Sequence, residues 1–216
     1  MERTVPSEVE SATRRRLEAA KPLPEPSLDG QVSLERTLAL RRSVRRYAPD
    51  ALSLAEAGQL LWAAQGVTHR DGRRTSPSAG ALYPLEAYLA AERVSDLEPG
   101  LYRYQALGHY LSVVASERIL SVLAAQTWGQ DWIAGAAAVV TLAAVSVRTS
   151  ERYGERAPRY VHMEAGHAAQ NVLLQAAALG LAAVVVGAFD DAAVARVLRS
   201  APDERPLCLL PVGRRA

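Results

Sequence analysis

The sequence predicts an α+β fold in which a mixed β-sheet is wrapped by helices. Two short helical patterns come first, three strand patterns follow in succession, and helices then alternate with strands to the end. This order is typical of α+β proteins rather than of a doubly wound fold. The 216 residues are 49% hydrophobic and 22% charged, which is enough apolar material to bury one sizeable core.

The first 32 residues differ from the rest of the chain. They mix charged residues with four prolines and show no sustained apolar period, apart from a helical pattern at 11–20. We therefore expect residues 1–32 to form an N-terminal arm that lies over the domain or over a partner subunit. Residues 33–216 are expected to form a single domain.

Two capped helices open that domain. Ser33 begins a helix that ends at Leu40, and Ser53 begins a helix that ends at Gln65. Serine is favoured at these positions because its hydroxyl accepts a hydrogen bond from a free N–H of the first turn. Glu56 stands three residues after Ser53 and completes a capping box.

Residues 66–84 read as a long loop. A loop of this length is uncommon inside a compact domain unless it has a function. After this loop, the pattern of apolar residues predicts strands at 86–92, 100–104, 110–115 and 136–145, and a helix at 116–126.

The longest helix is predicted at 159–179. Pro158 stands at its start and Gly180 at its end, the positions that these residue types favour. Its own side chains are mostly alanine, valine and leucine on almost every face. This composition predicts that the helix is buried on most faces. A strand at 181–187, a helix from Asp190 to about 199 and a strand at 206–212 complete the expected elements.

Charge and composition exclude several classes of protein. The net charge of +2 is far from the strong positive field of a nucleic-acid binder. No signal peptide is visible, and the apolar runs at 136–147 and 179–189 are too short to span a bilayer. We expect a soluble cytoplasmic protein with no membrane partner. Cys208 is the only cysteine, lies in an apolar run, and is expected to be a buried, inert thiol.

The segment Arg41–Tyr47 contains four arginines within six residues, just before Pro49. Proline disfavours helix in the residue before it, so we expect the segment to be extended, with Arg41, Ser43 and Arg45 on one face. Guanidinium groups bind oxygens bidentately, so this face suits a phosphate and the polar edge of a planar ring. A solvated basic turn or a nucleic-acid patch are the alternatives for such a run taken alone.

No familiar metal or catalytic template fits. His162 and His167 are five residues apart, which rotates their rings about 140° from one another on a helix, so we expect no shared metal. The sequence contains no Walker loop, no dinucleotide-binding glycine motif and no nucleophile elbow.

Four further segments carry residues suited to a site. The segment 77–84 is rich in small residues that let backbone approach a flat ring. Polar groups and a glycine interrupt the apolar helix at Glu164, Gly166, Gln170 and Asn171. Residues 186–190 end a strand and open a helix, where free N–H groups are expected, and Arg214 and Arg215 follow the last strand.

These segments, in this order, resemble the flavin-dependent nitroreductase superfamily, and most closely its SagB/ThcOx-type dehydrogenases. The resemblance covers about residues 34–214, and its most specific parts are 41–47, 77–86 and 164–171, with a matching segment at 186–191. It implies a nitroreductase-like fold and an FMN cofactor at the interface of an intertwined homodimer.

The resemblance also implies roles for individual residues. Arg41, Arg214 and Arg215 would hold the phosphate, Ser43 and Arg45 would face the ribityl chain and the pyrimidine edge, and the Gly187 and Ala188 backbone would reach N5. The loop at 77–80 would lie along the ring from the second subunit. The full set of expected cofactor-binding residues is Arg41, Arg42, Ser43, Arg45, Pro77, Ser78, Ala79, Gly80, Gln170, Gly187, Ala188, Arg214 and Arg215. Gly166, Gln170 and Asn171 would equally suit helix packing or an interface.

The expected catalytic residues are Tyr153 and Arg152. SagB/ThcOx-type enzymes oxidise peptide thiazolines or oxazolines to azoles and commonly carry a Lys-Tyr pair shortly before the long helix. Here Arg152 stands where lysine is expected, and arginine stays protonated and cannot abstract a proton. Tyr153 could still relay one. An FMN-dependent oxidoreductase of this type, acting on a small-molecule or peptide-derived substrate, is the leading interpretation. An NAD(P)H-dependent nitro or quinone reductase and a non-catalytic flavin-binding assembly subunit are the alternatives.

Overall fold

A seven-stranded β-sheet forms the centre of the molecule. The computed structural model describes residues 20–216, and the expected helix at 11–20 lies almost entirely outside them. The strand order across the sheet is β1-β4-β3-β2-β5-β7-β6. The strands are β1 (Ala20–Pro22), β2 (Leu85–Ala91), β3 (Gly100–Gln105), β4 (Tyr110–Ala115), β5 (Ala138–Val145), β6 (Leu181–Ala183) and β7 (Glu204–Arg214).

The expected α+β class, with one sheet wrapped by helices, is confirmed, but the sheet is not mixed. Every neighbouring pair of these strands is antiparallel. Within residues 20–216 the only parallel pairing is an isolated bridge between Leu52 and Val94. The alternation of helices and strands near the end of the chain suggested parallel crossovers. Instead α7 returns the chain so that β7 runs antiparallel to both of its neighbours.

Three of the six described α-helices begin at a capping side chain. Ser33 and Ser53 accept hydrogen bonds from the Arg36 and Glu56 backbones, and the Ser53–Glu56 capping box is present. Asp190 accepts from the Ala193 backbone. The helices are α2 (Leu34–Leu40), α3 (Leu54–Gln65), α4 (Leu120–Ala124), α5 (Val147–Tyr153), α6 (Ala157–Ala178) and α7 (Asp191–Val197), with short 3₁₀ turns η1 (Ala79–Ala81), η2 (Asp131–Gly135) and η3 (Gly154–Arg156).

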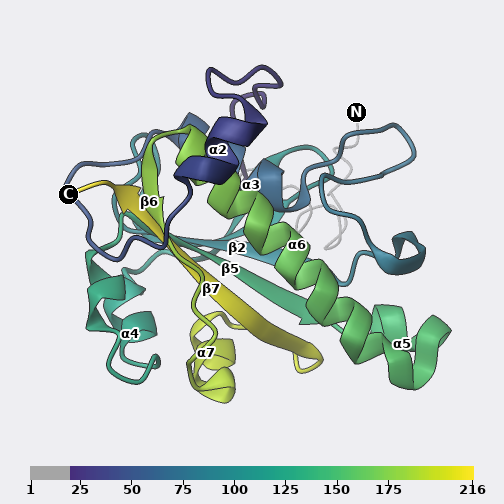
Figure 1. Ribbon diagram of the computed structural model, residues 1–216. Helices are drawn as coiled ribbons and strands as arrows, with labels where there is room; N and C mark the ends of the chain where they lie inside the picture. Colours follow the sequence, from purple (N-terminus) through teal and green to yellow (C-terminus); the bar gives the residue numbers. More distant parts are fainter. Residues whose placement is uncertain (1–19) are drawn as a thin grey trace, which may run out of the picture.

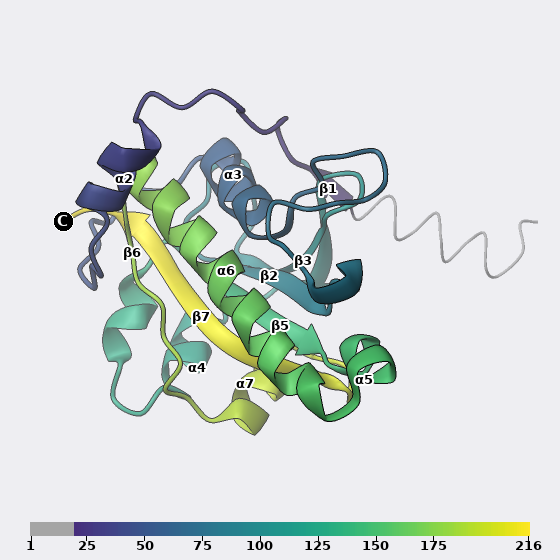
Figure 2. The same ribbon diagram turned by 45° about the vertical axis from the view of Figure 1, so that its right-hand side comes forward.

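Helices cover both faces of the sheet (Figure 1). Along β2, Leu85, Ala87 and Leu89 pack with α3 and α6 on one face, and Tyr88 and Ala90 pack with α4 and α7 on the other. This alternation follows from the two-residue period of a strand. The long α6 therefore crosses one face of the sheet, with α2 near its C-terminal end and α5 at its N-terminal end (Figure 2).

Two local predictions were wrong, and two short elements were not predicted. The helix expected at 116–126 spans only α4, and Glu117 and Arg118, which precede it, pair with Arg199 and Glu92. The strand expected at 181–187 ends at Ala183, although Val186 still bridges Leu209. Helix α5 was not predicted, since its seven residues lack an apolar period. Strand β1 was missed because it lies among prolines and charges.

The described part of the N-terminal arm lies against the domain. Strand β1 pairs with β4, and the Leu23 side chain is buried in the core next to it. The Ser27 backbone N–H donates to the Gln59 side chain on α3 at 2.9 Å. The division into an arm at 1–32 and a domain at 33–216 stays a prediction.

Helix α6 exposes one face, contrary to the expected burial on most faces. Val161, Ala165, Ala168 and Val172 are buried against the sheet, which confirms the apolar stripe. The opposite stripe is exposed and consists of His162, Met163, Gly166, His167 and Gln170. None of the helices within residues 20–216 is long and apolar enough to cross a membrane.

Candidate functional site

The arginine-rich residues 41–47, here called the basic segment, follow α2 and lie at one end of the sheet. It is extended, and the Val44 N–H donates to the Ala183 carbonyl on β6 at 3.0 Å. Tyr47 forms a bridge with Arg215, and an added Cβ on Gly213 would lie 3.0 Å from the Tyr47 ring. Because Gly213 has no side chain, Tyr47 can pack directly over β7. These contacts bring the basic segment, the end of β7 and β6 together.

The arginines of this segment point mainly into solvent. The Arg45 guanidinium lies 5.8 Å from the centre of the Trp132 ring, and the Arg42 guanidinium donates to the Ala39 and Arg41 carbonyls. Among residues 20–216 no carboxylate forms an ion pair with Arg41, Arg42, Arg45, Arg46 or Arg215. Positive charge is therefore concentrated here without a counter-charge from the described chain.

Arg214 has a different environment. Its guanidinium donates to both carboxylate oxygens of Glu56, at 2.6 and 2.9 Å, and to the Ala51 carbonyl at 3.2 Å. Burial opposes ionisation of Glu56, but hydrogen bonds from Ser53 and Arg214 outweigh it and lower the pKa of that carboxyl. The guanidinium group of Arg214 thus links β7 to the first turn of α3. Its expected contact with a phosphate stays a prediction.

Gly187 and Ala188 lie exposed between β6 and α7. An added Cβ on Gly187 would meet nothing within 4 Å, so the backbone there is open to a ligand. The Gln130 side chain donates to the Ala188 carbonyl at 2.9 Å. Since Trp132, two residues later, contacts Arg45, this one loop joins the basic segment to the exposed glycine.

The second cluster of expected residues is the loop Pro77–Gly80, at the other end of α6. Gly80, Ala81 and Tyr83 have φ angles of 63°, 55° and 47°. Such left-handed angles are strained for residues with a Cβ and often mark functional loops. The loop is held in this shape by the Ser78 hydroxyl, which accepts from the Tyr83 N–H at 2.9 Å.

Arg152 and Tyr153 meet this loop. An added Cβ on Gly80 would lie 2.9 Å from the Tyr153 hydroxyl and 3.2 Å from an Arg152 guanidinium nitrogen. Tyr153 is half-buried and packs edge-on against Tyr160, with ring centres 5.0 Å apart. The structure therefore brings both expected catalytic side chains beside an expected cofactor loop.

Arg148 fixes α5 in that position. Its guanidinium donates to the Tyr83 carbonyl at 3.1 Å and to the Glu86 carboxylate at 2.6 Å. Neither the helix α5 nor a role for Arg148 in the site was predicted from the sequence. The signal that could have found them is weak: an arginine shortly before the Arg152–Tyr153 pair.

Glu164 lies beneath the loop on α6 and is only 3% exposed. Burial raises the pKa of its carboxyl to about 7, although a hydrogen bond with Ser78 and the charge of Arg74 act in the opposite direction. One of its oxygens, Oε1, has no hydrogen-bond partner among the described residues. The carboxyl therefore changes charge near neutral pH next to the loop.

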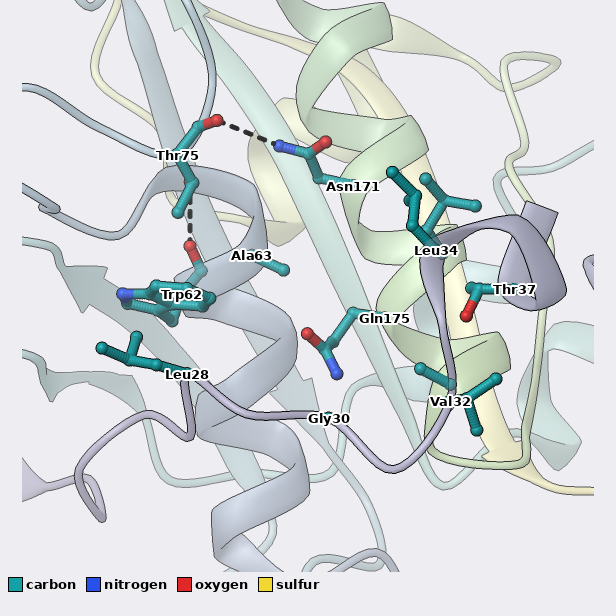
Figure 3. Close-up of a pocket in the computed structure, with 12 residues that line it drawn as sticks. Leu28, Gly30, Val32, Leu34, Thr37, Trp62, Ala63, Thr75, Asn171 and Gln175 are labelled. Carbon is teal, nitrogen blue, oxygen red and sulfur yellow. Dashed lines mark hydrogen bonds between the residues drawn. The ribbon is translucent and has the colours of Figure 1, made fainter.

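A cavity of about 410 Å³ lies between the arm, α3 and α6 (Figure 3). In Figure 3, Leu28 lies next to Trp62 of α3, and Val32 and Leu34 lie on the other side of Gln175 of α6. Asn171 donates to the Thr75 carbonyl at 3.4 Å and to the Ser76 hydroxyl at 3.2 Å. This contact secures the 66–84 loop to α6, so Asn171 has a structural partner within the chain.

The basic cluster and the loop cluster are far apart in one chain. Helix α6 has 22 residues, and at about 1.5 Å per residue it is roughly 33 Å long. The basic segment lies near its C-terminal end, and the loop with α5 lies near its N-terminal end (Figure 2). Gly166 and Gln170 stand exposed between them, and an added Cβ on Gly166 would meet nothing within 4 Å.

Comparison with known proteins identifies the family. The model of the family described as "Nitroreductase family" matches residues 38–214. The chain belongs to the nitroreductase family. MJ1384 of Methanocaldococcus jannaschii, which carries a nitroreductase name, is 45% identical over 185 residues, or 86% of this chain and 92% of the relative. The chain is thus a nitroreductase-family oxidoreductase.

Solved structures share the nitroreductase fold. A Ralstonia eutropha protein that carries a nitroreductase name is 31% identical with a TM-score of 0.81, over 92% of this chain and 90% of that one. A chain of the Escherichia coli microcin synthetase McbBCD complex with truncated pro-MccB17 bound has a TM-score of 0.70 at 24% identity, over 99% of this chain and 85% of that one. This second similarity concerns the fold alone.

The nitroreductase resemblance expected from the sequence is confirmed at the level of family and fold. The closer relation to SagB/ThcOx-type dehydrogenases stays a prediction, as do the individual roles of the site residues.

Proposed function

We propose that this nitroreductase-family protein is an FMN-dependent oxidoreductase, similar to the SagB/ThcOx-type dehydrogenases. The observation that carries the proposal is the group of arginines at the β6–β7 end of the sheet, which have no carboxylate partner within residues 20–216, beside the exposed backbone of Gly187 and Ala188. A cytoplasmic location, expected from the sequence, is part of the same proposal.

The residues present fit FMN. A phosphate needs donors and positive charge, and Arg41 and Arg215 provide both without an ion pair to a described carboxylate. Ser43 and Arg45 follow Arg41 and would hold the ribityl chain and the edge of the ring, with Arg42 beside them. The open backbone at Gly187 leaves room for a flat ring to approach. When bound, FMN supplies hydride exchange at its N5 atom.

We propose that the complete site requires a second copy of this chain. The basic cluster and the loop Pro77–Gly80 lie toward opposite ends of α6, so one chain cannot bring them together. A glycine within a helix costs about 1 kcal/mol relative to alanine, and no neighbour of Gly166 among the described residues explains it. Helix α2 also exposes Leu34, Leu38 and Leu40. Exposed apolar groups of this kind support an interface.

Gly166→Leu tests the homodimer. The side chain would enter open space in the isolated chain, so the monomer should fold at least as stably as the wild type. In the dimer it should obstruct the close approach of the partner and weaken association at least about 10-fold. Sedimentation equilibrium measures this. A Gly166→Leu protein that dimerises as tightly as the wild type would contradict an interface at this face.

The loop cluster supports a dehydrogenase with tyrosine as the proton-handling group. Arg152 remains protonated and would hold an anionic group or orient Tyr153, whose hydroxyl lies beside Gly80. The McbBCD complex, which shares the fold, is a microcin synthetase with truncated pro-MccB17 bound. That similarity supports a peptide-derived substrate such as a thiazoline or oxazoline, with a small molecule as the alternative.

An NAD(P)H-dependent nitro or quinone reductase is the second candidate function, favoured by the nitroreductase name of MJ1384. The decisive experiment begins with FMN binding, measured by the flavin absorbance of the purified protein. Rapid bleaching of the bound flavin by NAD(P)H would support the reductase. Turnover of a peptide azoline that Tyr153→Phe abolishes, with no bleaching by NAD(P)H, would support the dehydrogenase.

Two results of the same experiment would argue against both candidates. Absence of FMN binding, even with FMN added, would refute the flavin proposal. Normal FMN binding without turnover of any donor or acceptor would support a non-catalytic assembly subunit, the third interpretation.

A further inference from the structure

A second cavity, of about 430 Å³, lies between the end of the 66–84 loop, the β3–β4 turn and α5. None of the residues expected to bind FMN or to act in catalysis lines it. Its polar wall consists of Gln65, Arg74, Glu86 and Arg148, and Leu82, Leu85 and Leu107 provide apolar surface. Its volume is within the range of small-molecule sites.

Two hydrogen-bond donors stand side by side in the polar wall. The Arg74 guanidinium donates to the Gln65 side-chain oxygen at 2.8 Å, which orients the Gln65 amide. Gln65 is only 1% exposed, and its Nε2 group has no hydrogen-bond partner among the described residues. A buried N–H without an acceptor destabilises the protein, so a ligand that accepts from it gains binding free energy.

Arg74 is held rigidly in place. Its guanidinium stacks 4.7 Å from the centre of the Tyr83 ring, and its backbone N–H donates to the Tyr83 hydroxyl at 3.3 Å. A fixed guanidinium loses little conformational entropy when it binds an anion.

The charges of the wall leave Arg74 without a partner. Glu86 is already neutralised by Arg148, at 2.6 Å, and by Arg103, at 3.1 Å. Within residues 20–216 no carboxylate forms an ion pair with Arg74. Burial lowers the pKa of Arg74, and the nearby Glu86 and Glu164 only partly offset this. The cavity therefore has room for one negative charge.

We propose that this cavity binds a small carboxylate with an apolar body. The two carboxylate oxygens accept from the Arg74 guanidinium and from Gln65 Nε2, and the apolar body lies against Leu82, Leu85 and Leu107. A carboxylate matches this pair of adjacent donors, whereas a phosphate ester requires more donors than the wall offers. The site does not depend on FMN, so it stands apart from the proposed function.

Calorimetric titration with 2-naphthoate and with its neutral analogue 2-naphthamide tests the proposal. The acid should bind the wild-type protein at least 10-fold more tightly than the amide, because only the acid supplies the missing charge. Arg74→Met should weaken naphthoate binding at least 10-fold. The matched control is Arg73→Met, because the Arg73 side chain is 72% exposed and pairs with Asp71 outside the cavity.

Arg74→Lys and Gln65→Leu keep the test valid if Arg74→Met fails to fold. The lysine retains the charge but loses the fork, and the leucine removes the amide donor, so each should weaken binding of the acid several-fold. Equal binding of acid and amide, no binding by the wild type at millimolar concentration, or equal loss in Arg73→Met would overturn the proposal. Displacement of naphthoate by FMN would also overturn it, since the acid would then occupy the cofactor region.

Discussion

The two ends of α6 differ in how they present functional groups. At its C-terminal end, the half-buried Arg41 and the exposed Arg45 and Arg215 are cations on extended backbone, without carboxylate partners among the described residues. At its N-terminal end, Glu164 is buried and the loop Pro77–Tyr83 is strained and hydrogen-bonded. The first arrangement suits holding an anion from solution. The second suits fixing a geometry and controlling a proton.

Arg41→Ala should produce the largest effect if the basic end holds the phosphate. A charge-assisted hydrogen bond contributes about 1.5–3 kcal/mol, so the Kd for FMN should rise about 10- to 100-fold. Quenching of FMN fluorescence measures this. Arg36→Ala is the matched control, because Arg36 is an exposed arginine on α2, five residues earlier. Equal loss of affinity in both variants would show that the contribution is general charge and not a phosphate contact.

Glu164→Gln should change the pH dependence of stability at the other end. Burial raises the pKa of Glu164 from 4.5 to about 7, so the folded state binds this proton more tightly than the unfolded state. The contribution of protonated Glu164 to the stability of the folded state is fully present below pH 4.5. It is lost as the pH rises to about 7. The wild type should therefore lose about 2–3 kcal/mol across this window relative to Glu164→Gln.

Urea unfolding at several pH values measures that difference. All other titratable groups are common to both proteins, so their contributions cancel in the comparison. Glu151→Gln, on the exposed surface of α5, should keep the pH dependence of the wild type. Parallel curves for wild type and Glu164→Gln would refute an elevated pKa.

Comparison of Gly80→Ala with Gly72→Ala should distinguish a steric clash with Tyr153 from the strain of a left-handed backbone. Both Gly80 and Gly72 have positive φ, 63° and 85°, so alanine at either position should cost about 1 kcal/mol in stability. Only at position 80 would the new methyl group meet Tyr153, and this should lower turnover about 10-fold. Steady-state kinetics of both variants provide the measurement. Similar kinetics in the two would mean that Tyr153 is not in the catalytic site.

Arg45→Ala should produce the smallest effect and a different one. If Arg45 faces the polar edge of the flavin ring, its loss should shift the flavin reduction potential by tens of millivolts, where about 30 mV corresponds to 1.4 kcal/mol for two electrons. FMN affinity should change less than in Arg41→Ala. Equal changes of potential and affinity in both variants would remove this division of roles.

The sequence predicts the basic end well because its signals are local. Pro49, the run of arginines and the Ser33 and Ser53 caps act over a few residues, and the structure has the helices and the extended segment where these signals place them. The loop end depends on contacts between distant residues, such as Arg148 with Glu86 and Gly80 with Tyr153. No spacing in the sequence encodes such contacts.

The antiparallel sheet was missed for a related reason. Strands β5 and β7 pair across 59 to 74 residues of sequence, with register from Ala138–Val212 to Val145–Glu204. Their direction is decided by how α6 and α7 pack, which apolar periodicity alone does not specify. The same holds for α5, a seven-residue helix that is fixed by Arg148 rather than by its own propensity.

The single cysteine, Cys208, allows the separation of β7 from β5 to be measured. Cys208 lies buried in β7 opposite Leu142 of β5, and burial raises the pKa of its thiol to about 12. The thiolate is the reactive form, so the folded protein should resist alkylating reagents, whereas an unfolded thiol with a pKa of about 8.5 reacts readily. The rate of alkylation therefore reports how often β7 separates from β5, without an engineered label.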